Sequence, residues 1–157
     1  MSEVYLTREG YEKLRQELEY LKTTKRREIT RAIAEARAQG DLSENAEYDA
    51  AREEQGHCEA RIAKMEGKLS NVRIIEDMDI PSDKIYIGAK VTLKDRDSGE
   101  EIHYQMLSPE EADIEQNKIS ILSPIGQGLM GHAAGEDVDV DVPAGTLHYS
   151  ILKIERP

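Results

Sequence analysis

The sequence predicts an α+β protein whose helices and strands lie in separate halves. Two observations lead to this fold class. Apolar residues recur at three- and four-residue spacing through the first half, as in amphipathic helices, and they alternate with polar residues in the second half, as in half-buried strands. The chain has 157 residues, enough for one or two compact units.

The first helical arm is predicted to begin near Thr7, which can cap a helix, and to end at Gly40, which tolerates a left-handed conformation. Its apolar stripe includes Leu14, Leu18, Leu21, Ile29, Ile33 and Ala36. A second stripe follows after a short turn and comprises Tyr48, Ala51, Cys58, Ile62, Met65, Leu69 and Val72. Two such stripes predict an antiparallel coiled coil, in which each arm of about 30 residues would be roughly 45 Å long.

The turn between the arms carries acidic residues in the segment Gly40-Asp41-Leu42-Ser43-Glu44. If the second helix begins near Leu42 or Ser43, the carboxylates of Asp41 and Glu44 share its first turn. They could then cap the helix and complement its dipole. Alternatively, exposed carboxylates at the end of a stalk could complete the coordination of a Mg²⁺ that belongs to another molecule. Periodicity alone leaves both interpretations open.

The helical pattern stops between residues 78 and 88, where Pro81-Ser82-Asp83 indicates a linker. We therefore predict a helical hairpin over residues 1–77, a linker over 78–88 and a β-rich domain over 89–157. Its expected antiparallel strands contain Val91–Leu93, Tyr104–Met106, Ile119–Ile121, Val138–Val142 and Tyr149–Ile154. Ser123, Pro124 and Gly131 outline a short helix between the middle strands.

Composition argues against several functions. The net charge of −11 disfavours general binding to duplex nucleic acid, no apolar run is long enough for a membrane span, and no signal peptide is evident. The single cysteine, Cys58, is predicted to be a packed thiol, and the four histidines lack zinc-ligand spacing. Asp137, Asp139 and Asp141 alternate as on the solvent face of a strand and do not form a calcium loop. We expect a cytoplasmic, monomeric protein.

Several separated motifs resemble one family over nearly the whole chain. The segment from Ala36 to Glu53 is similar to the tip of bacterial GreA-type transcript cleavage factors, of the GreA/GreB family. The resemblance extends to Leu6–Leu14, to Lys68–Asn71 and to Ile119–Gly126.

This resemblance implies an accessory factor and not an enzyme. The coiled coil would enter the secondary channel of a backtracked bacterial RNA polymerase, where the 3′ end of the nascent RNA lies. Asp41 and Glu44 would match the acidic pair that helps to hold a second Mg²⁺ in the polymerase active centre and to orient the attacking water. The polymerase itself would hydrolyse the RNA, and the isolated chain would bind no cofactor stably.

Basic residues are concentrated in the first half of the chain. Residues 1–77 contain 14 Lys and Arg and 17 Asp and Glu, whereas residues 78–157 contain 7 Lys and Arg and 15 Asp and Glu. Arg37 and Arg52 lie near the predicted tip. They could be ordinary surface partners of nearby glutamates, or a small patch that grips RNA phosphates. The resemblance favours the RNA-binding interpretation.

For the second half, the resemblance implies an FKBP-like fold that docks on the polymerase at the rim of the secondary channel. We expect Ser123, Pro124, Ile125 and Gly126 to provide the docking surface, although these residues could simply cap a helix. Prolyl isomerisation is disfavoured because this half has only three aromatic residues, Tyr86, Tyr104 and Tyr149.

Two other functions remain as alternatives. A channel-binding regulator or inhibitor of RNA polymerase would share the shape without supporting cleavage, and a coiled-coil adaptor would have no use for the acidic tip. The chemistry of Asp41 and Glu44 discriminates among them.

Overall fold

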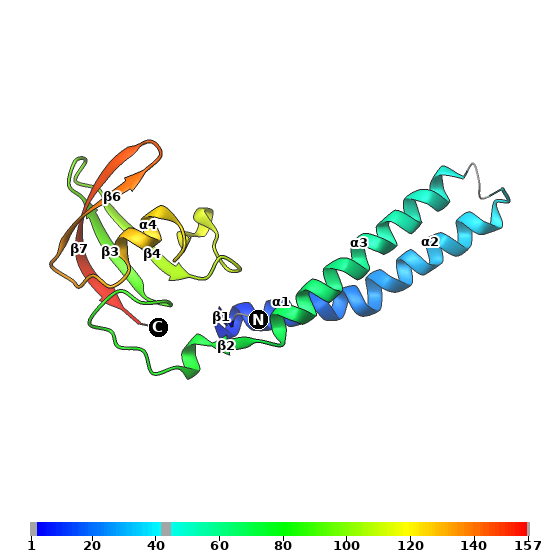
Figure 1. The fold of residues 1–157 in the computed structure, drawn as a ribbon, viewed down its shortest axis with the longest axis horizontal. Helices are drawn as coiled ribbons and strands as arrows, with labels where there is room; N and C mark the ends of the chain where they lie inside the picture. The colour runs from blue at the N-terminus through cyan, green and yellow to red at the C-terminus, as the bar shows by residue number, and fades with distance from the viewer. Residues whose placement is uncertain (1–2, 42–44, 157) are drawn as a thin grey trace. The chain divides into compact units, whose positions relative to one another are not determined.

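The computed structural model describes residues 3–41 and 45–156, and the chain forms two compact units (Figure 1). One unit is built on Tyr11–Val72, and the other on Glu3–Gly10 together with the chain from Arg73 onward. The fold is α+β, as predicted, with a helical hairpin and a curled β-sheet. In the described residues, no helix is long and apolar enough to cross a membrane.

The hairpin consists of α1 (Arg8–Tyr20), the π-helical segment η1 (Leu21–Lys25), α2 (Arg26–Ala38) and α3 (Ala46–Leu69). Figure 1 shows α2 and α3 running side by side. The predicted stripes meet in a core of Leu21, Ile29, Ile33, Ala51, Cys58, Ile62 and Met65. Burial of these side chains is the main force that holds the two arms together.

The π-helical segment η1 accounts for an irregularity in the first stripe. Leu21 and Ile29 are both buried, and they are eight positions apart. A coiled-coil repeat spans seven residues in two turns, so the first stripe contains one additional residue. A π-turn accommodates one additional residue, so that the apolar face regains its phase beyond Lys25. Cys58 packs beside this segment, with its Sγ 3.9 Å from the carbonyl oxygen of Leu21, which confirms the predicted buried thiol.

Ion pairs flank the hairpin core. Arg26 and Glu59 form two hydrogen bonds, of 2.9 and 2.7 Å, and Lys25 Nζ lies 2.6 Å from Glu54 Oε1. Such exposed pairs contribute little to stability, because water screens the charges. Their consequence is therefore mainly to favour one register of the two arms.

The second unit contains a five-stranded sheet in the order β5-β4-β3-β7-β6. Its strands are β3 (Lys90–Asp95), β4 (Glu101–Leu107), β5 (Lys118–Ser120), β6 (Asp137–Val142) and β7 (Gly145–Glu155). The pairing is antiparallel as predicted, except that β5 runs parallel to β4. The short helix α4 (Pro124–Leu129) packs against β6, and Leu129 and Val140 belong to the same core.

Part of the predicted linker belongs to this core. Ile85 is fully buried, its backbone N–H donates to the carbonyl of His132, and the N–H of Gly88 donates to Met106. The chain is therefore fixed to the sheet before β3 begins.

Two short strands were not predicted from the sequence. β1 (Val4–Leu6) pairs with β2 (Val72–Ile74), so Val72 is a strand residue and does not belong to the stripe of the second arm as expected. Two 3₁₀ turns, η3 (Ile75–Asp77) and η4 (Ile114–Gln116), complete the second unit.

The start of α1 is held by a distant carboxylate. Glu111 accepts hydrogen bonds from the backbone N–H and the hydroxyl of Thr7, at 2.5 and 2.6 Å. The Thr7 hydroxyl oxygen in turn accepts from the N–H of Gly10 at 3.0 Å, as expected of the predicted cap. A Cβ at Gly10 would overlap the carboxylate of Glu111, so a larger residue would displace this side chain.

Candidate functional site: the turn of the helical hairpin

The turn begins where the first arm ends. α2 closes at Ala38, and Gly40 has a φ of 109°, a conformation that glycine tolerates and that ends the arm as predicted. Asp41 follows at once and is exposed. Glu44, the second residue of the predicted acidic pair, lies outside the described residues, and so do Leu42 and Ser43. The structure thus places one of the two predicted carboxylates at the end of the hairpin.

The second arm begins later than expected. α3 starts at Ala46, whereas the sequence suggested a start near Leu42 or Ser43. Its cap is Asn45, whose side-chain oxygen accepts from the N–H of Tyr48 at 3.0 Å and whose amide donates to the carbonyl of Ala36 at 2.7 Å. Asn45 therefore caps α3 and ties the two arms together, and Asp41 lies outside the first turn of α3.

Sequence reasoning missed Asn45 because the turn offers several residues that can cap a helix. Asp41, Ser43 and Asn45 all belong to the preferred types, and the sequence does not show which one has the required extended backbone. The available signal was the spacing of Asn45 to Tyr48 and Ala51, the first apolar residues of α3.

The two predicted RNA-binding arginines are exposed and lie near the turn on different arms. The guanidinium carbon of Arg37 is 5.9 Å from the centroid of the Tyr48 ring, within the range of a cation–π contact. Arg52 is four positions beyond Tyr48, so the two residues share a face of α3. The tyrosine therefore connects Arg37 to the face of α3 that carries Arg52.

The predicted docking segment coincides with the start of α4. The Ser123 hydroxyl accepts from the N–H of Gly126 at 3.1 Å, and Pro124 occupies the first helical position, so the predicted cap is confirmed. Ser123, Pro124 and Ile125 also line an apolar groove of about 370 Å³, whose wall includes Ile114, an exposed isoleucine. Gly126 is buried beneath, where a Cβ would overlap the carbonyl oxygen of Ser120.

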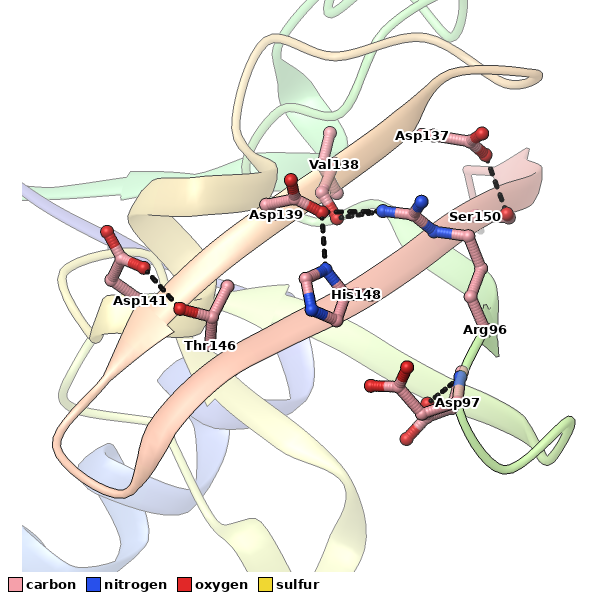
Figure 2. Close-up of polar contacts among 10 residues, drawn as sticks. Arg96, Asp97, Asp137, Val138, Asp139, Asp141, Thr146, His148 and Ser150 are labelled. Carbon is pink, nitrogen blue, oxygen red and sulfur yellow. Dashed lines mark hydrogen bonds and ion pairs between the residues drawn. The ribbon is translucent and has the colours of Figure 1, made fainter.

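The aspartates of β6 form polar pairs with β7, as Figure 2 shows. Asp137 accepts from Ser150, Asp141 accepts from Thr146, and Asp139 lies between His148 and Arg96, at 2.7 and 2.6 Å. The hydrogen bond with His148, the largest contribution, lowers the pKa of Asp139, and the same bond raises the pKa of His148. These aspartates are on the solvent face of the strand, as predicted, and the described residues contain no group of three or more potential metal ligands.

Comparison with known proteins gives the family. The family model described as transcription elongation factor, N-terminal, matches residues 4–74, and the model for the GreA/GreB C-terminal domain matches residues 80–156. The chain belongs to the GreA/GreB family of transcription elongation factors. Its general role is therefore in transcription elongation.

Individual relatives of this GreA/GreB chain agree. It is 53% identical over 152 residues to the transcription elongation factor GreA of Chlorobium phaeobacteroides and 50% identical over 151 residues to that of Chloroherpeton thalassium, with 96% of each chain covered in both cases. The crystal structure of GreA factor homolog 1 of Thermus thermophilus is 34% identical, covers 98% of this chain and 99% of its own, and has a TM-score of 0.45.

Proposed function

We propose that this chain binds bacterial RNA polymerase, inserts its helical hairpin into the secondary channel and stimulates Mg²⁺-dependent cleavage of backtracked nascent RNA. The observation that carries the proposal is the exposed Asp41 at the end of the first arm, together with the assignment of the capping role to Asn45. Asn45 accepts the hydrogen bond from the N–H of Tyr48 in the first turn of α3. The exposure of Asp41 supports a metal-binding role for its carboxylate.

Asp41 and Glu44 would supply carboxylate oxygens to a Mg²⁺ held mainly by the polymerase. When bound, this ion would activate a water molecule and offset the charge that develops on the phosphate. Mg²⁺ sites usually combine one or two carboxylates with phosphate oxygens and water, so two carboxylates alone should bind it weakly. We therefore expect the isolated chain to be an accessory factor that does not cleave RNA.

Arg37 and Arg52 would position the RNA. Both are exposed near the turn, and a guanidinium can bind phosphate oxygens in two parallel hydrogen bonds. The contact of Arg37 with Tyr48 limits the freedom of its long side chain, so less entropy is lost when it binds RNA.

The groove beside α4 would dock the chain on the polymerase. Its wall is predominantly apolar, and exposed apolar surface of this kind marks protein contact sites. Pro124 and Ile114 are exposed there, and we expect them to be covered by the rim of the secondary channel.

The test is RNA cleavage in stalled, backtracked complexes with the double variant Asp41→Asn and Glu44→Gln. These substitutions keep size and hydrogen bonding but remove both negative charges. Cleavage should fall by orders of magnitude while polymerase binding is retained, and additional Mg²⁺ should restore part of the activity. Asp49→Asn, an exposed position on α3, is the matched control and should cleave like the parent.

A folded, polymerase-bound double variant with normal cleavage would contradict the proposal. It would favour the alternative function, a channel-binding regulator without cleavage support. That alternative also predicts that the parent chain slows elongation and does not release arrested complexes, so the same assay distinguishes the two.

A further inference from the structure

A second groove lies on the polar face of the sheet in the second unit, distinct from the apolar groove beside α4. It has a volume of about 350 Å³ and is lined by Lys90, Thr92, His103, Gln105, Asn117 and Glu155, among others. Sites for small molecules usually measure about 300–1,000 Å³ and carry a few polar groups that fix the ligand. The groove therefore has the size of a small-ligand site.

The strand register brings these side chains together. Lys90 is opposite Gln105 on β4 and Glu155 on β7, and Thr92 is opposite His103. Residues 90 and 92 on one strand and 103 and 105 on the next share one face, because side chains alternate along a strand. Hydroxyl, imidazole, amide and amine groups thus line a continuous surface.

Asn117 is held at the end of this surface in an unusual conformation. Its φ of 58° makes it the single non-glycine residue with positive φ in the described part of the chain. Its carbonyl oxygen accepts from the N–H of Gln105 at 2.9 Å, which fixes it beside β4. Asparagine tolerates the left-handed conformation better than most residues, and here it ends the 3₁₀ turn η4 and sets the position of residue 117 beside the groove.

Some polar side chains in the groove are paired within the protein, as Thr92 is with His103 at 3.3 Å, and others are not. Among the described residues, the side chains of Lys90, Gln105, Gln116 and Asn117 make no hydrogen bond or ion pair. The polar face of β6 differs, because each of its aspartates is paired with a side chain of β7. The groove consequently presents donors that are available to a ligand.

The charge of the groove favours an anion. Lys90 and His103 lie near Glu155, and Glu155 is already paired with Lys153, whose Nζ is 2.5 Å from its Oε1. Glu101 is a weaker neighbour, 3.8 Å from His103. Lys90 therefore places a positive charge here although the second half of the sequence has 15 acidic and only 7 basic residues.

We propose that this groove binds a nucleoside phosphate, with Lys90 and His103 contacting the phosphoryl oxygens and the amides of Gln105 and Asn117 contacting the base. Glu155 would accept a hydrogen bond from a sugar hydroxyl. The amide groups offer both donors and acceptors, which suits the edge of a base, and an amine beside an imidazole suits a phosphoryl group. This inference is independent of the function proposed for the hairpin.

The test is titration of the full chain with ATP and GTP, followed by amide chemical shifts in NMR spectra and by calorimetry. The shifts should move at Gln105 and Asn117. Lys90→Gln should weaken binding about tenfold, the effect of losing one charge-assisted hydrogen bond. Lys94→Gln is the matched control, because Lys94 is exposed on the same strand and the same face but outside the groove. It should bind like the parent.

Two further ligands identify which part of the nucleotide is recognised. Inorganic phosphate and an unphosphorylated nucleoside should each bind much more weakly than the triphosphates. Equal affinity for inorganic phosphate would overturn the proposal, as would equal losses in the two lysine variants. A single-stranded oligonucleotide that binds far more tightly than ATP would also overturn it, in favour of a nucleic-acid surface. Circular dichroism melting should show that both variants remain folded.

Discussion

Single residues at the turn decide how the hairpin is closed. Asn45 both caps α3 and bonds to the last turn of α2, so one side chain serves two helices. A substitution at Asp41 leaves both of these groups of Asn45 unchanged.

Asn45→Ala should destabilise the hairpin by about 2 kcal/mol, because it removes a cap of about 1 kcal/mol and a hydrogen bond of similar value. Urea unfolding followed by circular dichroism measures this loss. Asn45→Asp is the control, since a carboxylate still accepts from Tyr48 but cannot donate to Ala36, and we expect about half the effect. Equal losses in both variants would show that the cap contributes nothing.

His148 provides a prediction on pH. Its hydrogen bond with Asp139 raises the pKa of the imidazole above 6.5, so its stabilising contribution is complete below about pH 6.5 and is lost as the pH rises through the higher folded-state pKa. Asp139→Asn should return the pKa of His148 toward its ordinary value, as followed by NMR titration. Asp141→Asn, which changes the pair with Thr146, should leave it unchanged.

At the scale of elements, the long helix α3 is not optimised for stability. Gly56 lies in its interior and Gly67 in its last turn, and a Cβ at either position would meet nothing within 4 Å. Gly56→Ala and Gly67→Ala should each stabilise the hairpin by about 0.5–1 kcal/mol, because alanine has the higher helix propensity. Thermal melting of both single variants and of the double variant tests this. No increase in the melting temperature would contradict the prediction.

Gly126→Ala in α4 should have the opposite effect. Here the Cβ would overlap a backbone oxygen, so α4 must shift at a cost of about 1–3 kcal/mol. If the groove beside α4 is the docking surface, this shift of α4 should also lower the affinity for polymerase. Pro124→Ala, which removes only an exposed ring, should reduce affinity with little loss of stability.

Helices and strands were predictable from the sequence where apolar residues recur at a regular spacing. The core stripes of the two arms, the positions of the five sheet strands and the capped helix α4 follow from repeating patterns and local chemistry. The π-helical segment was not predicted, because one additional residue between Leu21 and Ile29 only appears irregular in the sequence. The parallel pairing of β5 also escaped prediction, because a strand of three residues without a hairpin turn does not reveal its direction.

The candidate site was only partly predictable from the residues themselves. Charge and spacing located the acidic turn, but the pattern allowed both a cap and a metal ligand. Family resemblance favoured the metal ligand, which stays a prediction. The groove around Lys90 was missed because it depends on register between strands and on the conformation of Asn117, neither of which leaves a local signature.

At the scale of the whole molecule, the chain is joined by contacts that are far apart in the sequence. Thr7 and Glu111 are separated by 104 positions, and Arg8 forms an ion pair with Asp77. The beginning of the chain is therefore part of the second unit, and α1 continues from it into the hairpin.

Glu111→Ala should loosen the start of the chain. It removes two hydrogen bonds to a charged acceptor, each worth about 1.5–3 kcal/mol. Amide exchange over residues 3–10 should accelerate, whereas exchange in the core of α3 should remain slow. Glu115→Ala, at an exposed position nearby, is the control and should exchange like the parent. Unchanged exchange at Thr7 and Gly10 in the Glu111 variant would show that the carboxylate does not hold this segment.

The contact between Thr7 and Glu111 also has a consequence for synthesis on the ribosome. Translation produces the amino-terminal residues first, and Glu111 follows 104 residues after Thr7. The helical hairpin can therefore form its own core co-translationally, while the first turn of α1 acquires the carboxylate only after β3 and β4 have left the exit tunnel. Completion of the amino terminus is thus a late step in the folding of this protein.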